Sequence, residues 1–338
     1  MPYLKVYNKA QVDAVVKKRK GETKFGERVL TLESHQNLHE QLIRSDAKYV
    51  LVGIKEDIGV KANLGRIGAA NAWEPTLAAL LNTQHNKYNK GSALLLLGCL
   101  DFSELQKEAK DLSPSIPESL ERLYESVAVI DKEVTQLSFE IISAKKTPVF
   151  VGGGHNNAYG IIKGAALAHN KRINVINFDA HTDLRATSGR HSGNGFSYAM
   201  AEGFLKNYFV FGIHENYTSK KLFEKLEASA HQIQYNTFEE LEVDGVKSFD
   251  HQLHKALDFI KKSPFGIELD VDAIENIPSS ARTPSGFSST QARKYVRFFG
   301  KQKNAAYLHI CEAAPDVNSP EEQHLIGKLL SYLITDFI

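Results

Sequence analysis

Short apolar runs alternate with amphipathic stretches along most of the chain. Eight runs rich in Leu and β-branched residues predict strands at 49–53, 93–97, 148–152, 173–178, 208–212, 232–235, 266–270 and 306–310. Because these runs lack polar alternation, both faces of each strand should be buried, as in a parallel sheet. Amphipathic stretches predict helices at 37–43, 73–81, 131–143, 159–168, 220–226, 249–260, 290–299 and 320–338. The pattern predicts an α/β fold, a doubly wound and mostly parallel sheet of about eight strands with helices on both faces.

No internal repeat and no Pro/Gly/Ser-rich linker divides the chain. We therefore expect a single domain over 1–338, with 1–45 as an N-terminal extension packed on it. The stretch 106–122 is mostly polar and contains Pro114 and Pro117 among serines, so it is predicted to be a surface loop.

The composition excludes several classes of function. The 41 Lys and Arg residues nearly balance the 40 Asp and Glu residues, which leaves no long-range field for nucleic acid or an anionic membrane. The N-terminus has no apolar core of signal-peptide length, and no apolar run is long enough to span a bilayer. Cys99 and Cys311 both lie in apolar runs, which indicates buried thiols in a reducing compartment. We expect a cytoplasmic protein with a small-molecule substrate and neither a nucleic-acid nor a membrane partner.

Acidic and histidine side chains follow three of the predicted strands. Because the carboxyl ends of parallel strands meet at one edge of a sheet, these side chains should converge there. Spacing by two residues places the acids after each strand on one side of an extended segment. The candidates are His155, Asp179, His181, Asp183, Asp270 and Asp272.

Four carboxylates packed together without cations would repel strongly. Two divalent metals would neutralise them, and an oxygen-rich set without Cys favours Mn²⁺ over a structural zinc site. Each motif alone has a simpler interpretation: an Asp-x-Asp after a strand is common, and a Gly-Gly-Gly turn can cradle phosphate. GGGHNNAYG does not match the Gly-x-Gly-x-x-Gly spacing of a dinucleotide site, however. The joint occurrence at three strand ends favours a binuclear metal site, which activates water as a nucleophile.

Three segments resemble the arginase/agmatinase/formimidoylglutamase family, the ureohydrolases: NFDAHTD at 177–183, GGGH at 152–155 and LDVD at 269–272. The resemblance extends from about residue 52 to the C-terminal helix and implies an arginase-like fold, two Mn²⁺ per chain and a homo-oligomer. It implies that the first manganese binds His155, Asp179, Asp183 and Asp270, and the second Asp179, His181, Asp270 and Asp272.

The resemblance also implies catalytic roles. Asp183 would pass a proton to the leaving nitrogen, and Glu312 matches a substrate-side glutamate of the relatives. His191 is a weaker candidate for a proton shuttle, because the corresponding histidine of arginases follows at a longer spacing.

The segments 53–70, 183–185 and 190–197 are similar to formimidoylglutamases, which convert N-formimino-L-glutamate to L-glutamate and formamide in histidine degradation. The two carboxylates of this substrate need cationic partners. The candidates near predicted strand ends are Arg185, Arg190, Arg66 and Arg282. Arginase, which forms ornithine and urea from L-arginine, is the alternative, followed by agmatinase or another guanidino-acid hydrolase. Asn156 and Phe196 depart from the family patterns and bear on the substrate, not on the metal ligands.

Two further readings remain. One is the deacetylase branch of the same architecture, which uses a single zinc, and the other is a scaffold that has lost its chemistry. Both are disfavoured because all six ligand positions of a two-metal site are filled in this sequence.

Overall fold

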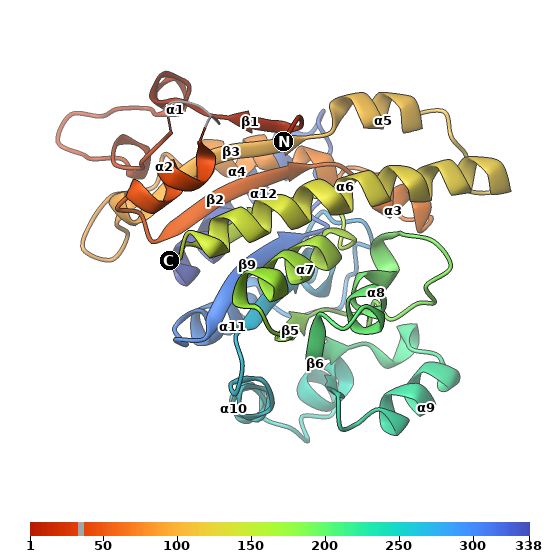
Figure 1. Cartoon of the computed structure of the whole chain (residues 1–338). Coiled ribbons are helices and arrows are strands. Elements are labelled where there is room, and N and C mark those ends of the chain that lie inside the picture. The colour runs from red at the N-terminus through yellow and green to blue at the C-terminus, as the bar shows by residue number, and fades with distance from the viewer. Residues whose placement is uncertain (33–36) are drawn as a thin grey trace.

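The computed structural model describes residues 1–32 and 37–338, and within them nine strands form one sheet (Figure 1). The order across the sheet is β1-β3-β2-β4-β9-β8-β5-β6-β7. Only β1 is antiparallel to its neighbour, β3. The strands are β1 (Leu4–Val6), β2 (Tyr49–Lys55), β3 (Leu94–Asp101), β4 (Thr147–Val151), β5 (Ile173–Phe178), β6 (Leu205–Ile213), β7 (Ile233–Thr237), β8 (Phe265–Asp270) and β9 (Ala305–Cys311).

Helices cover both faces of the sheet, because alternate strand residues point to opposite sides. In β2, Leu51 joins the core on one side, and Val50 and Val52 join the core on the other. The first core is covered by α1 (Lys9–Val15), α4 (Trp73–Leu80), α10 (Phe249–Ile260), α11 (Ser289–Gly300) and α12 (Pro320–Phe337). The second is covered by α2 (Leu38–Arg44), α3 (Ile58–Ala62), α5 (Ser103–Ala109), α6 (Pro117–Ser143), α7 (Asn157–His169), α8 (Gly195–Ala201) and α9 (Lys220–Ala228).

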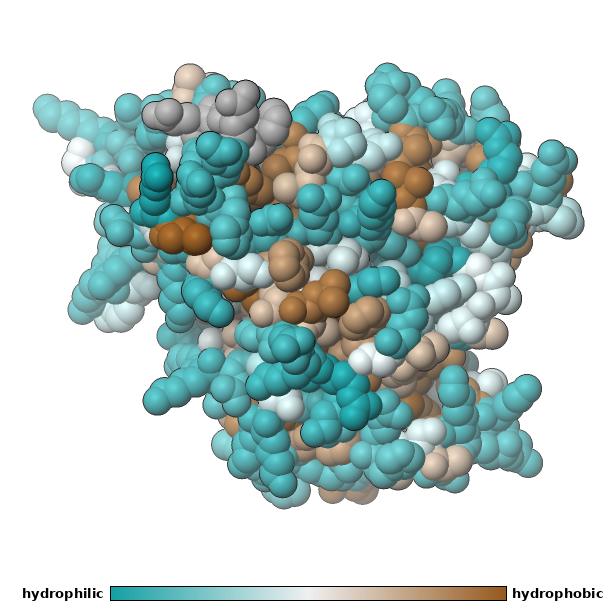
Figure 2. Space-filling model, in the orientation of Figure 1, coloured by the Kyte–Doolittle hydropathy of each residue, from teal (hydrophilic) through white to brown (hydrophobic). Residues whose placement is uncertain are grey.

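The helices α6 and α7 lie on the face of the sheet that Figure 1 views. Hydrophilic side chains predominate on the surface there, with apolar patches among them (Figure 2). None of the helices in the described part of the chain is long and apolar enough to cross a membrane.

The eight predicted strands and the doubly wound architecture are confirmed. The ninth strand, β1, was not predicted, and neither were the short helices α1, α3 and α8. The predicted surface loop at 106–122 is correct only for residues 110–116, since α5 ends at Ala109 and α6 begins at Pro117. Proline suits the first helical position because it lacks only an N–H that no helical carbonyl would accept. Most polar residues of that stretch are exposed, whether on the two helices or between them.

Four adjacent strands, β4, β9, β8 and β5, form the middle of the sheet and run parallel to one another. Their carboxyl ends therefore meet at one edge. The chain leaves this edge through 152–155, 179–183, 270–272 and 312–314, the segments that contain the candidate site residues.

Candidate metal centre

The turn after β4 positions His155. Gly152 and Gly153 adopt φ of +91° and +73°, the left-handed region that glycine enters without strain. The buried carboxylate of Glu56 then fixes the turn, because it accepts hydrogen bonds from the Gly154 N–H at 3.0 Å and from Asn157 Nδ2 at 2.6 Å. As a result, His155 is fully buried against the ends of the neighbouring strands.

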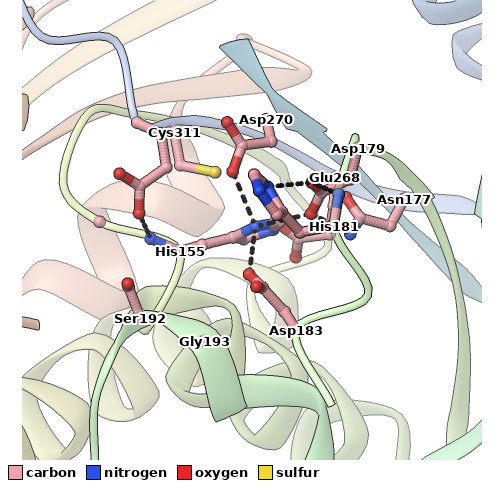
Figure 3. Close-up of polar contacts among 12 residues, drawn as sticks. His155, Asn177, Asp179, His181, Asp183, Ser192, Gly193, Glu268, Asp270 and Cys311 are labelled. Atoms are coloured by element: carbon pink, nitrogen blue, oxygen red, sulfur yellow. Dashed lines mark hydrogen bonds and ion pairs between the residues drawn. The ribbon is translucent and has the colours of Figure 1, made fainter. Parts of the chain in front are cut away.

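Three carboxylates surround one nitrogen of this histidine. His155 Nδ1 lies 2.9 Å from Asp183 Oδ2, 3.3 Å from Asp179 Oδ2 and 3.3 Å from Asp270 Oδ2 (Figure 3). Asp179 is oriented by Asn177, whose Nδ2 donates to Asp179 Oδ2 at 2.8 Å.

A second group adjoins the first. His181 Nδ1 lies 3.1 Å from Asp272 Oδ2 and 3.6 Å from Asp179 Oδ1. Asp179 thus belongs to both groups, one oxygen facing each histidine. The structure brings all six candidate ligands together, as the strand-end pattern predicts.

The arrangement fits divalent cations. Adjacent ligands of an octahedral ion with bonds of roughly 2.1 Å lie about 3 Å apart, close to the spacings around His155 and His181. Both ring nitrogens of His155 and Asp272 Oδ1 are buried and make no hydrogen bond among the described residues. The donors are oxygen and imidazole nitrogen, which suits Mn²⁺. Cys311 is also near, but burial raises the pKa of its thiol well above the usual value, and Sγ faces the Leu269 carbonyl at 3.6 Å.

The pKa shifts of the buried side chains also indicate that the site attracts positive charge. Burial raises the pKa of Asp270 well above its usual value, and the neighbouring Asp272 and Asp179 raise it further. Burial alone would lower the pKa of His181, but Asp272 and Asp179 raise it to about 12. The protein without metal therefore relieves the repulsion among its acids by holding protons, and bound cations can replace those protons.

Glu312 borders the same site. It directly follows β9 with a φ of +62°, and its Oε1 accepts a hydrogen bond from the His155 backbone N–H at 2.7 Å. Its Oε2 is buried and has no hydrogen-bond partner among the described residues. Burial raises the pKa of Glu312 to about 8. A buried carboxylate oxygen without a partner is suited to bind a cationic or N–H-bearing substrate group.

Sequence reasoning missed two buried acids, Glu56 and Glu268. Glu268 lies within β8, where Oε1 accepts from the Tyr307 hydroxyl at 2.7 Å and Oε2 lies 2.6 Å from His309 Nδ1. Burial raises the pKa of Glu268, but the adjacent His309 and His155 lower it to about 2. The available signal was an acid inside an otherwise apolar strand, which is rare without a partner.

The four candidate arginines lie in different surroundings. Arg190 is buried, forms a two-pronged ion pair with Asp131 and donates to the Asn156 carbonyl at 2.9 Å. Arg66 donates to the Ser279 and Ala314 carbonyls. Arg282 forms an exposed ion pair with Glu322.

Arg185 differs from the other three. It is exposed, and its guanidinium has no hydrogen-bond or ion-pair partner among residues 1–32 and 37–338. A methyl group added at Gly193 would lie 3.0 Å from Arg185 Cδ and 2.9 Å from Asn63 Nδ2, so both side chains reach this glycine in the short turn at 192–194.

His191 is outside the acid cluster. Its Nδ1 accepts a hydrogen bond from the Gly193 N–H at 3.1 Å and thereby caps a short helical turn. Burial lowers the pKa of His191 to about 4, and Arg185 and Arg190 act in the same direction. This imidazole is neutral at pH 7 and is engaged as an acceptor.

Comparisons with known proteins agree with the geometry. The chain is 30% identical over 244 residues to a formimidoylglutamase of Chromobacterium violaceum, which covers 70% of each chain. It is 27% identical to a formimidoylglutamase of Streptococcus pyogenes over 85% of this chain and 84% of that protein. A Bacillus subtilis formimidoylglutamase has a similar structure, with a TM-score of 0.73 and 19% identity over 95% of this chain and 93% of that one. A Trypanosoma cruzi formiminoglutamase with Mn²⁺ has a TM-score of 0.69 and 18% identity over 94% and 98%. Residues 47–335 match the Arginase family, and the chain belongs to that family.

Proposed function

We propose that this protein is a binuclear manganese hydrolase that converts N-formimino-L-glutamate and water to L-glutamate and formamide. One observation underlies the proposal: four aspartates and two histidines converge in two groups that share Asp179. The names of the relatives support the choice of substrate, since proteins named formimidoylglutamase match over most of their length.

The residues divide naturally between two metals. His155, Asp179, Asp183 and Asp270 would hold the first, and Asp179, His181, Asp270 and Asp272 the second. When bound, the metals supply an activated water and polarise the substrate. In the reaction, water oxygen bonds to the formimino carbon, and the bond from that carbon to the glutamate nitrogen breaks. With a cationic formimino group, both protons of the water end on the released amine, which leaves as an ammonium, and formamide keeps the terminal nitrogen as its NH2 group.

Two carboxylates of the protein would transfer a proton and bind the charged formimino group of the substrate. Asp183 contacts His155 Nδ1 at 2.9 Å, and it would carry a proton to the leaving nitrogen. Glu312 would accept a hydrogen bond from the formimino group through Oε2, because Oε1 is already engaged by the His155 N–H. A cationic formimino group beside this carboxylate would form a charge-assisted hydrogen bond.

We assign a substrate carboxylate to Arg185. The guanidinium groups of Arg66, Arg190 and Arg282 already bind carbonyls or carboxylates of the chain. Arg185 alone among the four candidates is exposed without such a partner, and it adjoins Asn63 across Gly193. A two-pronged arginine–carboxylate contact would select glutamate derivatives over agmatine, which has no carboxylate.

The test is product release from the manganese-loaded protein with formiminoglutamate, arginine, agmatine and guanidinobutyrate in parallel. We expect glutamate and formamide from the first and no urea from the others. Urea from arginine or agmatine would retain the metal site and reject the substrate. Absence of turnover with two bound metals would reject the hydrolase itself.

Arg185→Ala tests the recognition step. We expect a 10- to 100-fold higher KM for formiminoglutamate, about the value of a charge-assisted hydrogen bond. Arg282→Ala is the matched control, because that arginine is exposed and forms only a surface ion pair, so its KM should change by less than about twofold. Equal effects of the two substitutions would remove Arg185 from substrate recognition.

We further propose a cytoplasmic homo-oligomer made of single-domain subunits. Free, buried Cys99 and Cys311 support a reducing compartment, and all nine strands of the described chain belong to one sheet. Light scattering coupled to size exclusion tests the assembly, and a mass of one chain would contradict it.

A further inference from the structure

We propose that Glu268 is a positioning residue that fixes the His155 ring for metal binding, with His309 and Tyr307 holding Glu268 in turn. The inference rests on the metal site of the proposed function and adds residues that the six-ligand set does not include. It starts from an acid in the middle of β8 whose side chain is fully buried. A carboxylate is retained in such a place only when donors surround it.

The register of the sheet places this acid directly below the metal ligands. Glu268 pairs with Asn177 of β5 on one side and with His309 of β9 on the other. Asp270 lies two residues further along β8, so its side chain and that of Glu268 point to the same side of the sheet. The row Asn177–Glu268–His309 therefore forms a polar layer under the acid cluster.

Three polar groups surround the Glu268 carboxylate, two at hydrogen-bond distance and one at ion-pair distance. The Tyr307 hydroxyl donates to Oε1 at 2.7 Å, His309 Nδ1 lies 2.6 Å from Oε2, and His155 Nε2 lies within ion-pair range of the same Oε2, at 3.5 Å. When a metal binds Nδ1, the ring keeps its proton on Nε2, where it faces a carboxylate that can only accept. Nδ1 then presents its lone pair towards Asp179, Asp183 and Asp270, where a metal would bind.

The sequence makes room for this arrangement at Gly266. A Cβ at Gly266 would lie 2.2 Å from the Tyr307 hydroxyl oxygen, so any side chain there would displace the phenol from Glu268. The ring of His155 is bounded on another side by Phe196, which contacts it edge-on at 5.0 Å between centroids. Packing and the Glu268 carboxylate together leave the imidazole one orientation. Carboxylates that hold metal-binding histidines in this way increase metal affinity.

Glu268→Gln is the principal test. A glutamine amide has a single acceptor oxygen, so it cannot serve His309, His155 and Tyr307 together. We expect Mn²⁺ to bind 10- to 100-fold more weakly in one of two binding steps measured by calorimetry, with the other step unchanged. At a Mn²⁺ concentration that fills both sites of the parent, electron paramagnetic resonance should show isolated ions in place of coupled pairs. Excess Mn²⁺ should restore kcat with KM for substrate unchanged.

Two tyrosine variants provide a matched pair. Tyr307→Phe removes the donor to the Glu268 carboxylate and should weaken the same step, by less than Glu268→Gln does. Tyr295→Phe removes a hydroxyl of the same kind that donates to the Glu268 backbone carbonyl at 3.1 Å, and it should leave both steps unchanged. The pair decides the question even if Glu268→Gln does not fold.

Each contrary result has one meaning. Parental affinity in both Glu268→Gln and Tyr307→Phe, or equal weakening of both steps, would overturn the positioning role. Equal effects of Tyr307→Phe and Tyr295→Phe would also overturn it, since a general loss of packing would then be the cause. A parent that binds fewer than two metals would instead reject the metal site of the proposed function.

Discussion

Two acids of the candidate site have backbone conformations that few side chains adopt. Asp183 and Glu312 have φ of +48° and +62°, in the left-handed region, which costs a non-glycine residue about 1–3 kcal/mol. Neighbouring hydrogen bonds maintain the strain at Glu312: its N–H donates to the Gly153 carbonyl, and its carbonyl accepts from the Ser280 N–H. The strained turn directs the carboxylate towards His155 instead of along the edge of the sheet.

Glu312→Gln tests whether this acid acts on the substrate side. The amide keeps the shape and can still accept the His155 N–H, but it cannot pair with a cationic formimino group. We expect two metals per chain by mass spectrometry. We also expect kcat to fall by about 100-fold or more, because a contact that stabilises the transition state is lost. Glu275→Gln, an exposed change in a neighbouring loop, should retain full kcat. Metal loss in Glu312→Gln would move this residue into the ligand set.

His191 provides a prediction about pH and stability. Its folded pKa of about 4 lies below the unfolded value of about 6.5, so the unfolded chain binds the proton more readily. The contribution of this neutral histidine to the free energy of unfolding is complete above about pH 6.5 and decreases as the pH falls towards 4, by on the order of 1 kcal/mol.

His191→Asn keeps a side-chain acceptor for the Gly193 N–H and cannot titrate. Urea unfolding of both proteins at pH 7 and pH 5 in chelator should show a smaller loss of stability in the variant. Identical losses would mean that His191 is not shielded from protonation.

At the scale of elements, one buried ion pair fastens the loop at 184–194. Arg190, just before the short turn at 192–194, reaches Asp131 in the middle of α6, and its guanidinium stacks between the rings of Tyr159 in α7 and Tyr198 in α8. It also contacts the Asn194 side chain within the loop. Three helices are thereby joined to the loop next to the acid cluster.

Arg190→Met should destabilise the fold by about 3–5 kcal/mol, because Asp131 is left buried without its partner. The double variant Arg190→Met with Asp131→Leu should regain most of that loss, since no unpaired charge remains. Denaturant unfolding of the three proteins measures both effects. A single variant within about 1 kcal/mol of the parent would contradict the role of the ion pair.

The helices and strands also show how much of the fold can be predicted from the sequence. Short apolar runs predict eight strands, and the aspartates and histidines after three of them predict the six candidate ligands, because parallel strand direction alone brings them together. The polar, proline-containing start of α6 was mistaken for a loop, since only the packing of its later turns shows that it is a helix. Asp131, the partner of Arg190, lies 59 residues away in the sequence, and Glu268 of β8 contacts His309 of the neighbouring strand β9. No local pattern contains such pairings.

On the scale of the whole molecule, the first residues protect an edge of the sheet. β1 pairs with β3, Leu4 is buried, and the Tyr7 hydroxyl accepts from Trp73 Nε1 at 3.2 Å. Without them β3 would expose a row of unpaired backbone groups, which promotes association between molecules.

Deletion of residues 2–7 should lower the free energy of unfolding by about 3 kcal/mol from the apolar burial lost. Thermal unfolding with light scattering should show a lower midpoint and aggregation. Lys5→Ala removes only the ion pair with Asp101 on this edge and is the control, with little change expected. An unchanged midpoint and a single monodisperse species after the deletion would contradict the edge-protecting role.

The ligand set has a consequence for the order of folding. His155, Asp179 and Asp270 follow three strands, β4, β5 and β8, and β9, which lies between β4 and β8 in the sheet, comes latest in the sequence. Metal can therefore bind tightly only after β4, β5, β8 and β9 have paired, which is a late event in a sheet built from such distant segments. Cations that arrive last do not accelerate folding; they slow unfolding. A chain made in a cell short of manganese would still reach its native topology, and the metal supply would determine how long it survives.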